Sequence, residues 1–220
     1  MQPTIQFFSG LNVNDLWFLG EAALRTLWIS VLSVSIGTVL GIFFGWILYE
    51  GKWVATLTIA PILDVFRSVP LIIQLVLFYN FAPIVGLNLG PFGSGVAILT
   101  IYTAALVASV TRGGIEAVGA PMRRAARSLG MSYWQDLRYV VLPIGGRAVF
   151  PAWVGVALGV MKDSALVSVL GYVELLKASQ ILITRTQEPL LILTIAGALY
   201  FALSYPISRY SASLEKRWAQ

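Results

Sequence analysis

The sequence contains no cysteine and no histidine. This excludes disulfides, thiolate or imidazole metal sites, cysteine nucleophiles and the Ser-His machinery of many hydrolases. Charged residues are also scarce, at 11% of the 220 residues, whereas soluble domains carry about 25%. Apolar residues make up 58%, and the mean hydropathy is +0.81. The composition therefore indicates an integral membrane protein.

Several nucleotide-binding and catalytic motifs are absent as well. The sequence has no G-x-x-x-x-G-K-[ST] phosphate loop, no H-E-x-x-H and no G-x-S-x-G. It also shows no convincing duplication of the kind found in many secondary transporters. If the chain takes part in active transport, the energy must come from a partner.

Five apolar runs approach the length of about 20 residues that a membrane-crossing helix needs. They cover approximately residues 22–49, 54–81, 95–110, 148–172 and 190–210. We therefore predict an all-α integral membrane protein of about five transmembrane helices, with residues 1–220 forming one transmembrane domain. Small residues such as Gly37, Gly41 and Gly45 in the first run favour close helix packing.

The basic residues are distributed unequally between the two sides of the predicted membrane domain. With the N-terminus outside, ten of the 15 Lys and Arg residues lie in inside segments and two lie in outside segments. Cytoplasmic loops carry the excess of positive charge, so we predict a periplasmic N-terminus and a cytoplasmic C-terminus. The net charge of +5 is then explained by cytoplasmic loops and membrane lipid, and we predict no nucleic-acid partner.

The segment between the third and fourth runs, residues 112–147, is predicted to be cytoplasmic and helical. Its apolar residues recur at steps of three and four, as in an amphipathic helix. We expect two short helices joined by a turn at Gly130, where a residue without Cβ tolerates positive φ. We expect Leu142-Pro143 to close the pair, because proline does not continue a helix. The pair could insert into a groove of another protein or lie on the membrane, with arginines on phosphate headgroups.

Polar residues inside the apolar runs are candidates for function, because a charge there costs at least about 2.5–3.5 kcal/mol on insertion scales. Asp64 and Arg67 stand one turn apart and could simply pair. Lys162 and Asp163 are adjacent and therefore point in directions about 100° apart. A water-filled path or a zwitterionic ligand would suit both charges.

Several segments resemble a known family of transport proteins. The residues Arg124-Ala125-Ala126, Gly130 and Leu142-Pro143 resemble the EAA loop of permease subunits of bacterial ABC importers. Further segments resemble the polar-amino-acid subfamily, of the histidine/glutamine/arginine type; these are residues 66–71 with 74–75, 112–115, 130–143 and 162–171.

The resemblance implies a permease subunit in the bacterial inner membrane that moves a polar amino acid from periplasm to cytoplasm by alternating access. It implies a dimer of permease chains, two ATPase subunits that bind ATP and Mg, and a periplasmic substrate-binding protein. This chain would then be no enzyme and hold no metal or cofactor. The residues expected to couple to the ATPases are Arg124, Ala125, Ala126, Gly130, Leu142 and Pro143.

The chain departs from the family pattern at three positions. Arg124 replaces the glutamate of the EAA loop, Ser109 replaces a second glutamate, and Gly155 replaces an asparagine. Because two of these positions lie in spans near the expected path, a heterodimer in which this chain binds ligand more weakly is favoured over a homodimer.

We expect the substrate site to use opposite charges for the two ends of an amino acid. Asp163 is the candidate for the α-ammonium, because charge attraction is strong where water is scarce. Arg67 is the candidate for the α-carboxylate, since a guanidinium fork matches its geometry. Lys162, Gln74 and Ser109 are weaker candidates that could serve only helix packing.

Three other functions remain open from the sequence. The chain could be an ABC permease for another small solute such as methionine. It could be a scaffold that binds partners and transports nothing. It could also be a membrane-embedded enzyme acting on lipid through Asp64 and Asp163, although it lacks His, Cys and clustered carboxylates.

Overall fold

The computed structural model describes residues 10–218, and within them it contains helices and turns and no strand. The α-helices are α1 (Val13–Glu50), α2 (Lys52–Ser68), α3 (Leu71–Phe81), α4 (Gly90–Ala117), α5 (Ala120–Ser128), α6 (Tyr133–Asp136), α7 (Leu142–Asp163), α8 (Leu175–Thr186) and α9 (Pro189–Trp218). Three short segments are η1 (Ala82–Val85) and η3 (Ser164–Leu170), both 3-10, and the π-helical η2 (Leu137–Val141). The predicted all-α fold class is confirmed.

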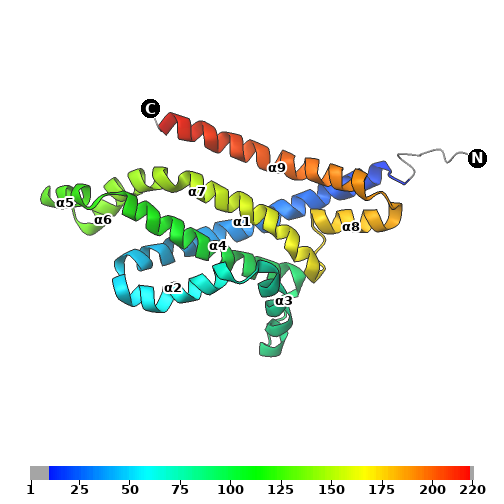
Figure 1. The fold of residues 1–220 in the computed structure, drawn as a ribbon, viewed down its shortest axis with the longest axis horizontal. Coiled ribbons are helices and arrows are strands. Elements are labelled where there is room, and N and C mark those ends of the chain that lie inside the picture. Colours follow the sequence, from blue (N-terminus) through cyan, green and yellow to red (C-terminus); the bar gives the residue numbers. More distant parts are fainter. Residues whose placement is uncertain (1–9, 219–220) are drawn as a thin grey trace, which may run out of the picture.

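The long helices lie side by side, with the short helices at the two ends (Figure 1). Helices α5 and α6 project at one end, where α9 also finishes, and α8 lies at the other end, where α1 begins. Among the described residues, four helical stretches are long and apolar enough to cross a membrane, and the bent pair α2–α3 would be a fifth. The predicted external N-terminal stretch lies partly outside the described residues, which begin at residue 10.

The helices extend beyond the predicted apolar runs. Helix α1 begins at Val13 because Asn12 and Asp15 form a reciprocal capping box, with bonds of 3.1 and 2.8 Å between side chains and backbone amides. Helix α4 covers residues 90–117 and α9 reaches residue 218, beyond the predicted ends at 110 and 210. An apolar run indicates the lipid-crossing part of a helix, whereas capping and packing determine its ends.

The second predicted span is not one straight helix. It breaks between α2 and α3, whose axes are bent by 104°. Pro70 restricts the preceding residue, and Val69 is extended, with φ −77° and ψ 131°. The side-chain amide of Gln74 donates to the carbonyls of Phe66 and Val69 at 2.8 and 2.7 Å. These bonds satisfy carbonyls that the broken helix would leave without partners.

The central contact of the fold joins α1 to α4 through glycines. Gly37, Gly41 and Gly45 are buried against α4. A Cβ on Gly41 would lie 2.5 Å from the Cβ of Val107 and 2.9 Å from the carbonyl oxygen of Ala104. The two backbones therefore approach more closely than any residue with a side chain would permit, as predicted for small residues in membrane helices.

Apolar clusters connect the remaining helices to this pair. Leu19, Leu175 and Ile192 join α1, α8 and α9 at the α8 end. Outward-facing apolar side chains remain on the long helices; Val39, for example, is 69% exposed. Such apolar outer faces suit lipid or a partner chain.

Candidate functional site

The turn between α5 and α6 is built by local sequence rules. Helix α5 ends at Ser128, and Gly130, two residues later, has a left-handed φ of 84°. The amide of Met131 donates to the carbonyl of Ala126 at 3.2 Å, and this bond closes the helix end. Helix α6 then starts with a capping box in which Ser132 and Gln135 exchange bonds. The predicted turn at Gly130, with positive φ there, is therefore confirmed, whereas the second helix of the pair is the start of a longer one.

The predicted closure of the pair at Leu142-Pro143 is wrong. Helical structure runs without interruption through α6, η2 and α7. The amide of Leu142 donates to the carbonyl of Leu137, five residues earlier, as in a π-helix. The wider turn accommodates Pro143 in the first turn of α7, where the missing amide hydrogen costs little. Proline thus fails to end the helix because a π segment precedes it.

A buried ion pair holds α5 against α6. The Nε atom of Arg123 donates to Oδ2 of Asp136 at 2.7 Å, and the side chains are 8% and 0% exposed. Nη1 of Arg123 also donates to the hydroxyl of Tyr49, near the end of α1, at 2.9 Å. Burial opposes the charge on Arg123, but Asp136 and Tyr49 outweigh it and raise its pKa above the usual value. Arg123 therefore keeps its positive charge, and its bonds to Asp136 and Tyr49 fix α5 and α6 to α1.

A second set of contacts attaches α6 to the same end of α1. The hydroxyl of Tyr133 donates to Oε1 of Glu50 and accepts from Nε1 of Trp46, both at 2.8 Å. The rings of Trp46 and Trp134 stack with centroids 6.2 Å apart. We refer to Arg123, Asp136, Tyr49, Tyr133 and Trp46 together as the α1 clamp. This clamp connects the projecting pair rigidly to a membrane-crossing helix.

Sequence reasoning did not identify the clamp, although one signal was available. Asp136 is the only acidic residue between Glu116 and Asp163, in a segment that contains five arginines. A single acid among arginines suggests a buried pair, but the sequence does not say which arginine is the partner.

The predicted coupling residues occupy different surroundings. Arg124, Ala125 and Gly130 are exposed on the outer face of the pair, whereas Ala126 is buried against the clamp side. Leu129 is 84% exposed beside them. Leu142 and Pro143 are exposed but belong to the continuous α6–α7 helix. The exposed residues of this segment therefore combine an apolar side chain, Leu129, with the arginines Arg124 and Arg127.

Two of the predicted substrate residues are brought together by α2 and α4. Nη1 of Arg67 donates to Oγ of Ser109, and Nη2 pairs with the carboxylate of Asp64. The pairing of Asp64 with Arg67, left open by the sequence, is therefore present in the structure. The Arg67 side chain remains 35% exposed, so a further contact to a ligand is sterically open.

The other predicted substrate residues lie elsewhere. Gln74 is buried at the α2–α3 break, where its amide nitrogen is already used. Lys162 and Asp163 are at the end of α7, where the helix tightens into η3. Lys162 is exposed and Asp163 is partly buried. Within residues 10–218, no hydrogen bond or ion pair joins either of them to Arg67.

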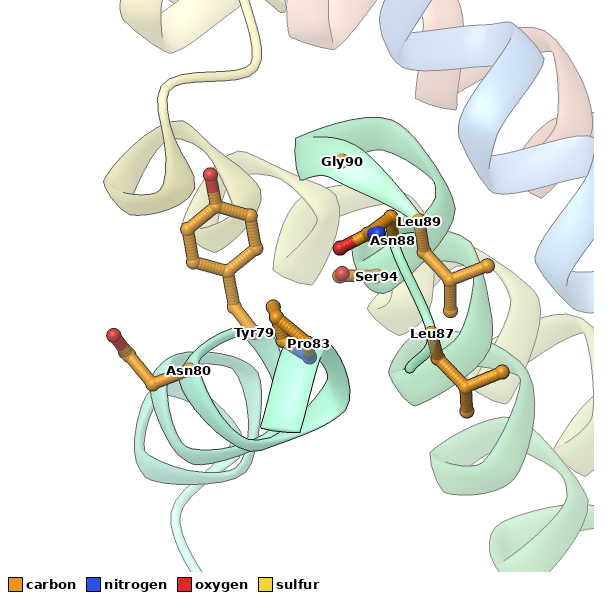
Figure 2. Close-up of a pocket in the computed structure, with 8 residues that line it drawn as sticks. All are labelled: Tyr79, Asn80, Pro83, Leu87, Asn88, Leu89, Gly90 and Ser94. Atoms are coloured by element: carbon orange, nitrogen blue, oxygen red, sulfur yellow. The ribbon is translucent and has the colours of Figure 1, made fainter. Parts of the chain in front are cut away.

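A cavity of about 500 Å³ lies at the turn between α3 and α4 (Figure 2). Figure 2 shows Asn88 and Ser94 on the α4 side facing the ring of Tyr79, while Asn80 points away. The full lining is Tyr79, Asn80, Pro83, Leu87, Asn88, Leu89, Gly90 and Ser94. None of these residues is charged, so the cavity offers no counter-ion for either end of an amino acid.

Comparisons with known proteins agree with this architecture. The glutamine transport system permease protein GlnP of Escherichia coli strain K12 is 31% identical over 199 residues, which cover 90% of this chain and 91% of the relative. A crystal structure of an amino acid ABC transporter with histidines has a TM-score of 0.86 at 31% identity, covering 97% and 99% of the two chains. The methionine ABC transporter MetNI, in inward-facing conformations, has a TM-score of 0.79 at 23% identity, covering 94% and 99%, and shares the fold.

The matching family model extends over most of the helical region described above. It covers residues 37–220 and describes the inner membrane component of binding-protein-dependent transport systems. It thus includes the clamp, the projecting pair and every predicted substrate residue. The chain is a member of this family of inner-membrane permease components.

Proposed function

We propose that the chain is the permease subunit of an ATP-binding-cassette importer that moves a polar amino acid into the cytoplasm. The similarity to a glutamine permease and to an amino acid transporter supports this substrate class. In the proposal, α5 and α6 face the cytoplasm and dock on ATPase subunits that bind ATP and Mg. A periplasmic binding protein delivers the substrate.

The observation that carries the proposal is the α1 clamp together with the continuous α6–α7 helix. Force applied to the outer face of α5 reaches α1 through Arg123 and Tyr49. The same force reaches α7 along uninterrupted helix, because residues 133–163 have no break. A rigid connection to two membrane helices is what alternating access by rigid-body rotation requires.

The surface proposed to dock on the ATPase subunits is formed by exposed residues of α5 and the turn after it, and it is basic. Between residues 117 and 139 the only acid is Asp136, which is buried, whereas Arg124 and Arg127 are exposed. Because exposed Leu129 accompanies these arginines, the surface fits an apolar groove with acidic residues at its rim. Arg124 then contacts a carboxylate of the ATPase. A glutamate at this position would instead require a basic partner.

For the substrate, Asp163 receives the α-ammonium group and Arg67 the α-carboxylate. Lys162, Gln74 and Ser109 are weaker contributors. Gly155, at the position of a family asparagine, leaves open space on α7 and removes one polar contact. We therefore favour a heterodimer in which a second permease chain binds the substrate more strongly.

The test is to co-express the tagged chain with its neighbouring genes, identify the co-purifying proteins, and reconstitute the complex in vesicles. Uptake of glutamine, histidine or arginine that needs both ATP and a binding protein supports the proposal. Uptake of methionine alone would reject the substrate class. A complex that contains an ATPase but transports no solute would indicate a scaffold, and lipid turnover by the purified chain would indicate an enzyme.

A further inference from the structure

An apolar groove lies beside the α1 clamp and shares Trp46 with it. Its volume is about 950 Å³, at the upper end of the roughly 300–1,000 Å³ typical of ligand pockets. Its walls are apolar side chains of α1, α4 and the η2–α7 junction, among them Val39, Ile42, Phe43, Ile115, Leu137 and Leu142. An occupant must therefore bury mostly hydrocarbon.

The groove lies where a membrane helix approaches its end. Val39 to Trp46 belong to the membrane-crossing stretch of α1, with Val39 69% exposed. Trp46 and Trp134 also line the groove and stack on each other. Tryptophan is enriched at the level where acyl chains meet headgroups. One end of the groove is thus at acyl-chain depth, and the other is at the depth of lipid phosphates.

The groove also carries one positive charge, that of Arg138. Arg138 lines the groove and is exposed. Among the described residues no ion pair or hydrogen bond involves its side chain. The other polar lining residues are Thr111, Gln135 and Tyr139, and no acidic residue lines the groove. An anionic group at Arg138 is therefore favoured by charge.

We propose that this groove binds an anionic phospholipid of the bilayer, with an acyl chain between α1 and α7 and the phosphate at Arg138. Basic pockets between membrane helices bind anionic headgroups in this way. A soluble phosphate would leave the apolar walls without a partner. A bound lipid would contact α1, α4 and the start of α7 together, beside the clamp, and would stabilise their arrangement.

The test measures lipid retention by native mass spectrometry on the purified complex. The complex is delipidated and then incubated with phosphatidylglycerol or phosphatidylcholine of identical acyl chains. The wild-type complex is expected to retain phosphatidylglycerol about fivefold more than phosphatidylcholine, which corresponds to about 1 kcal/mol for one basic residue. This comparison needs no variant, so it is decisive even if a substitution impairs folding.

Three variants then locate the site. Arg138→Gln is expected to remove the preference for phosphatidylglycerol, whereas Arg147→Gln, an exposed arginine of α7 outside the groove, is expected to keep it. Val39→Trp fills the acyl-chain end and is expected to lower retention of both lipids equally.

Equal retention of the two lipids by the wild type would overturn the proposal, as would a preference that survives Arg138→Gln. Crosslinking from residue 39 to a second permease chain, with no lipid retained, would assign the groove to a protein and also overturn it. None of these outcomes depends on which solute is transported.

Discussion

Arg123 and Asp136 stand 13 residues apart in the sequence, on two different helices, and their side chains meet at 2.7 Å in a site closed to solvent. The turn at Gly130 folds α5 back on α6 and makes this contact possible. Because Arg123 also reaches Tyr49 on α1, the pair fixes the projecting segment to the membrane domain.

Asp136→Ala is expected to destabilise the projecting segment strongly, because it leaves a buried guanidinium without its partner. Breaking a buried pair in this way costs about 3–5 kcal/mol. The thermal midpoint of the purified protein should fall, and limited proteolysis should cut within residues 120–138. Arg124→Ala, which removes an exposed arginine of the same helix, is the control and should change neither. The double variant Arg123→Met with Asp136→Leu should recover much of the loss, and a double variant as unstable as Asp136→Ala would contradict this account.

Gly41→Ala is expected to lower stability by about 1–3 kcal/mol, the range for overpacked cores. Its Cβ would meet Val107 and the Ala104 carbonyl, and a backbone carbonyl does not move aside easily. This outweighs the gain of up to about 1 kcal/mol from replacing glycine within a helix. Gly20→Ala on the same helix is the matched control, because nothing lies within 4 Å of its Cβ. Thermal unfolding in detergent should show a lower midpoint for Gly41→Ala and an equal or higher one for Gly20→Ala; the reverse order would disprove the close contact.

Glu174 should make the stability of the protein depend on pH. It is fully buried in the loop before α8 and accepts from the amides of Leu176 and Lys177 at 2.8 Å. Burial raises its pKa above the usual 4.5, although these hydrogen bonds oppose the shift. Between pH 4.5 and the folded-state pKa, the folded protein therefore holds a proton that the unfolded chain has lost.

The contribution of Glu174 to stability is consequently largest at low pH, falls as the pH rises from 4.5 through the folded-state pKa, and stays low above it. Glu174→Gln keeps an acceptor oxygen and has no charge, so its thermal midpoint should vary less with pH over this window. Glu116→Gln, on an exposed residue paired with Arg112, is the control and should follow the wild type. A Glu174→Gln profile parallel to that of the wild type would show that Glu174 titrates normally.

The features that sequence predicted correctly depend on short-range patterns. Apolar runs indicated the membrane helices, and a three-and-four periodicity with a glycine indicated that residues 120–141 are helical with a turn at Gly130. The features it missed depend on contacts between distant segments or on how a helix responds to proline. Arg123 meets Tyr49 across 74 residues, and no local pattern contains that contact.

Two proline positions had opposite outcomes, and the reason is physical. Pro70 breaks the predicted second span because Val69 becomes extended and Gln74 satisfies the freed carbonyls. Pro143 breaks nothing, because the π segment before it changes the register of the helical bonds. The break also explains why a polar residue, Gln74, occurs within an apolar run. Its buried side-chain amide supplies the hydrogen bonds that the carbonyls at the break need, and this role requires no contact with a substrate.

The substrate proposal predicts opposite effects for two aspartates of the membrane domain. Asp163→Asn keeps the shape of the side chain but removes the charge proposed for the α-ammonium group. The amino-acid concentration that gives half-maximal uptake, or half-maximal stimulation of ATPase activity, should rise about tenfold or more. This corresponds to a loss of about 1.4 kcal/mol or more of substrate-binding free energy. Asp64→Asn instead releases Arg67 from its ion pair and leaves the guanidinium free for a carboxylate, so the half-saturating concentration should stay equal or fall. Transport unchanged by Asp163→Asn would reject its proposed role, and a weaker interaction after Asp64→Asn would show that the Asp64–Arg67 pair acts as a unit in substrate binding.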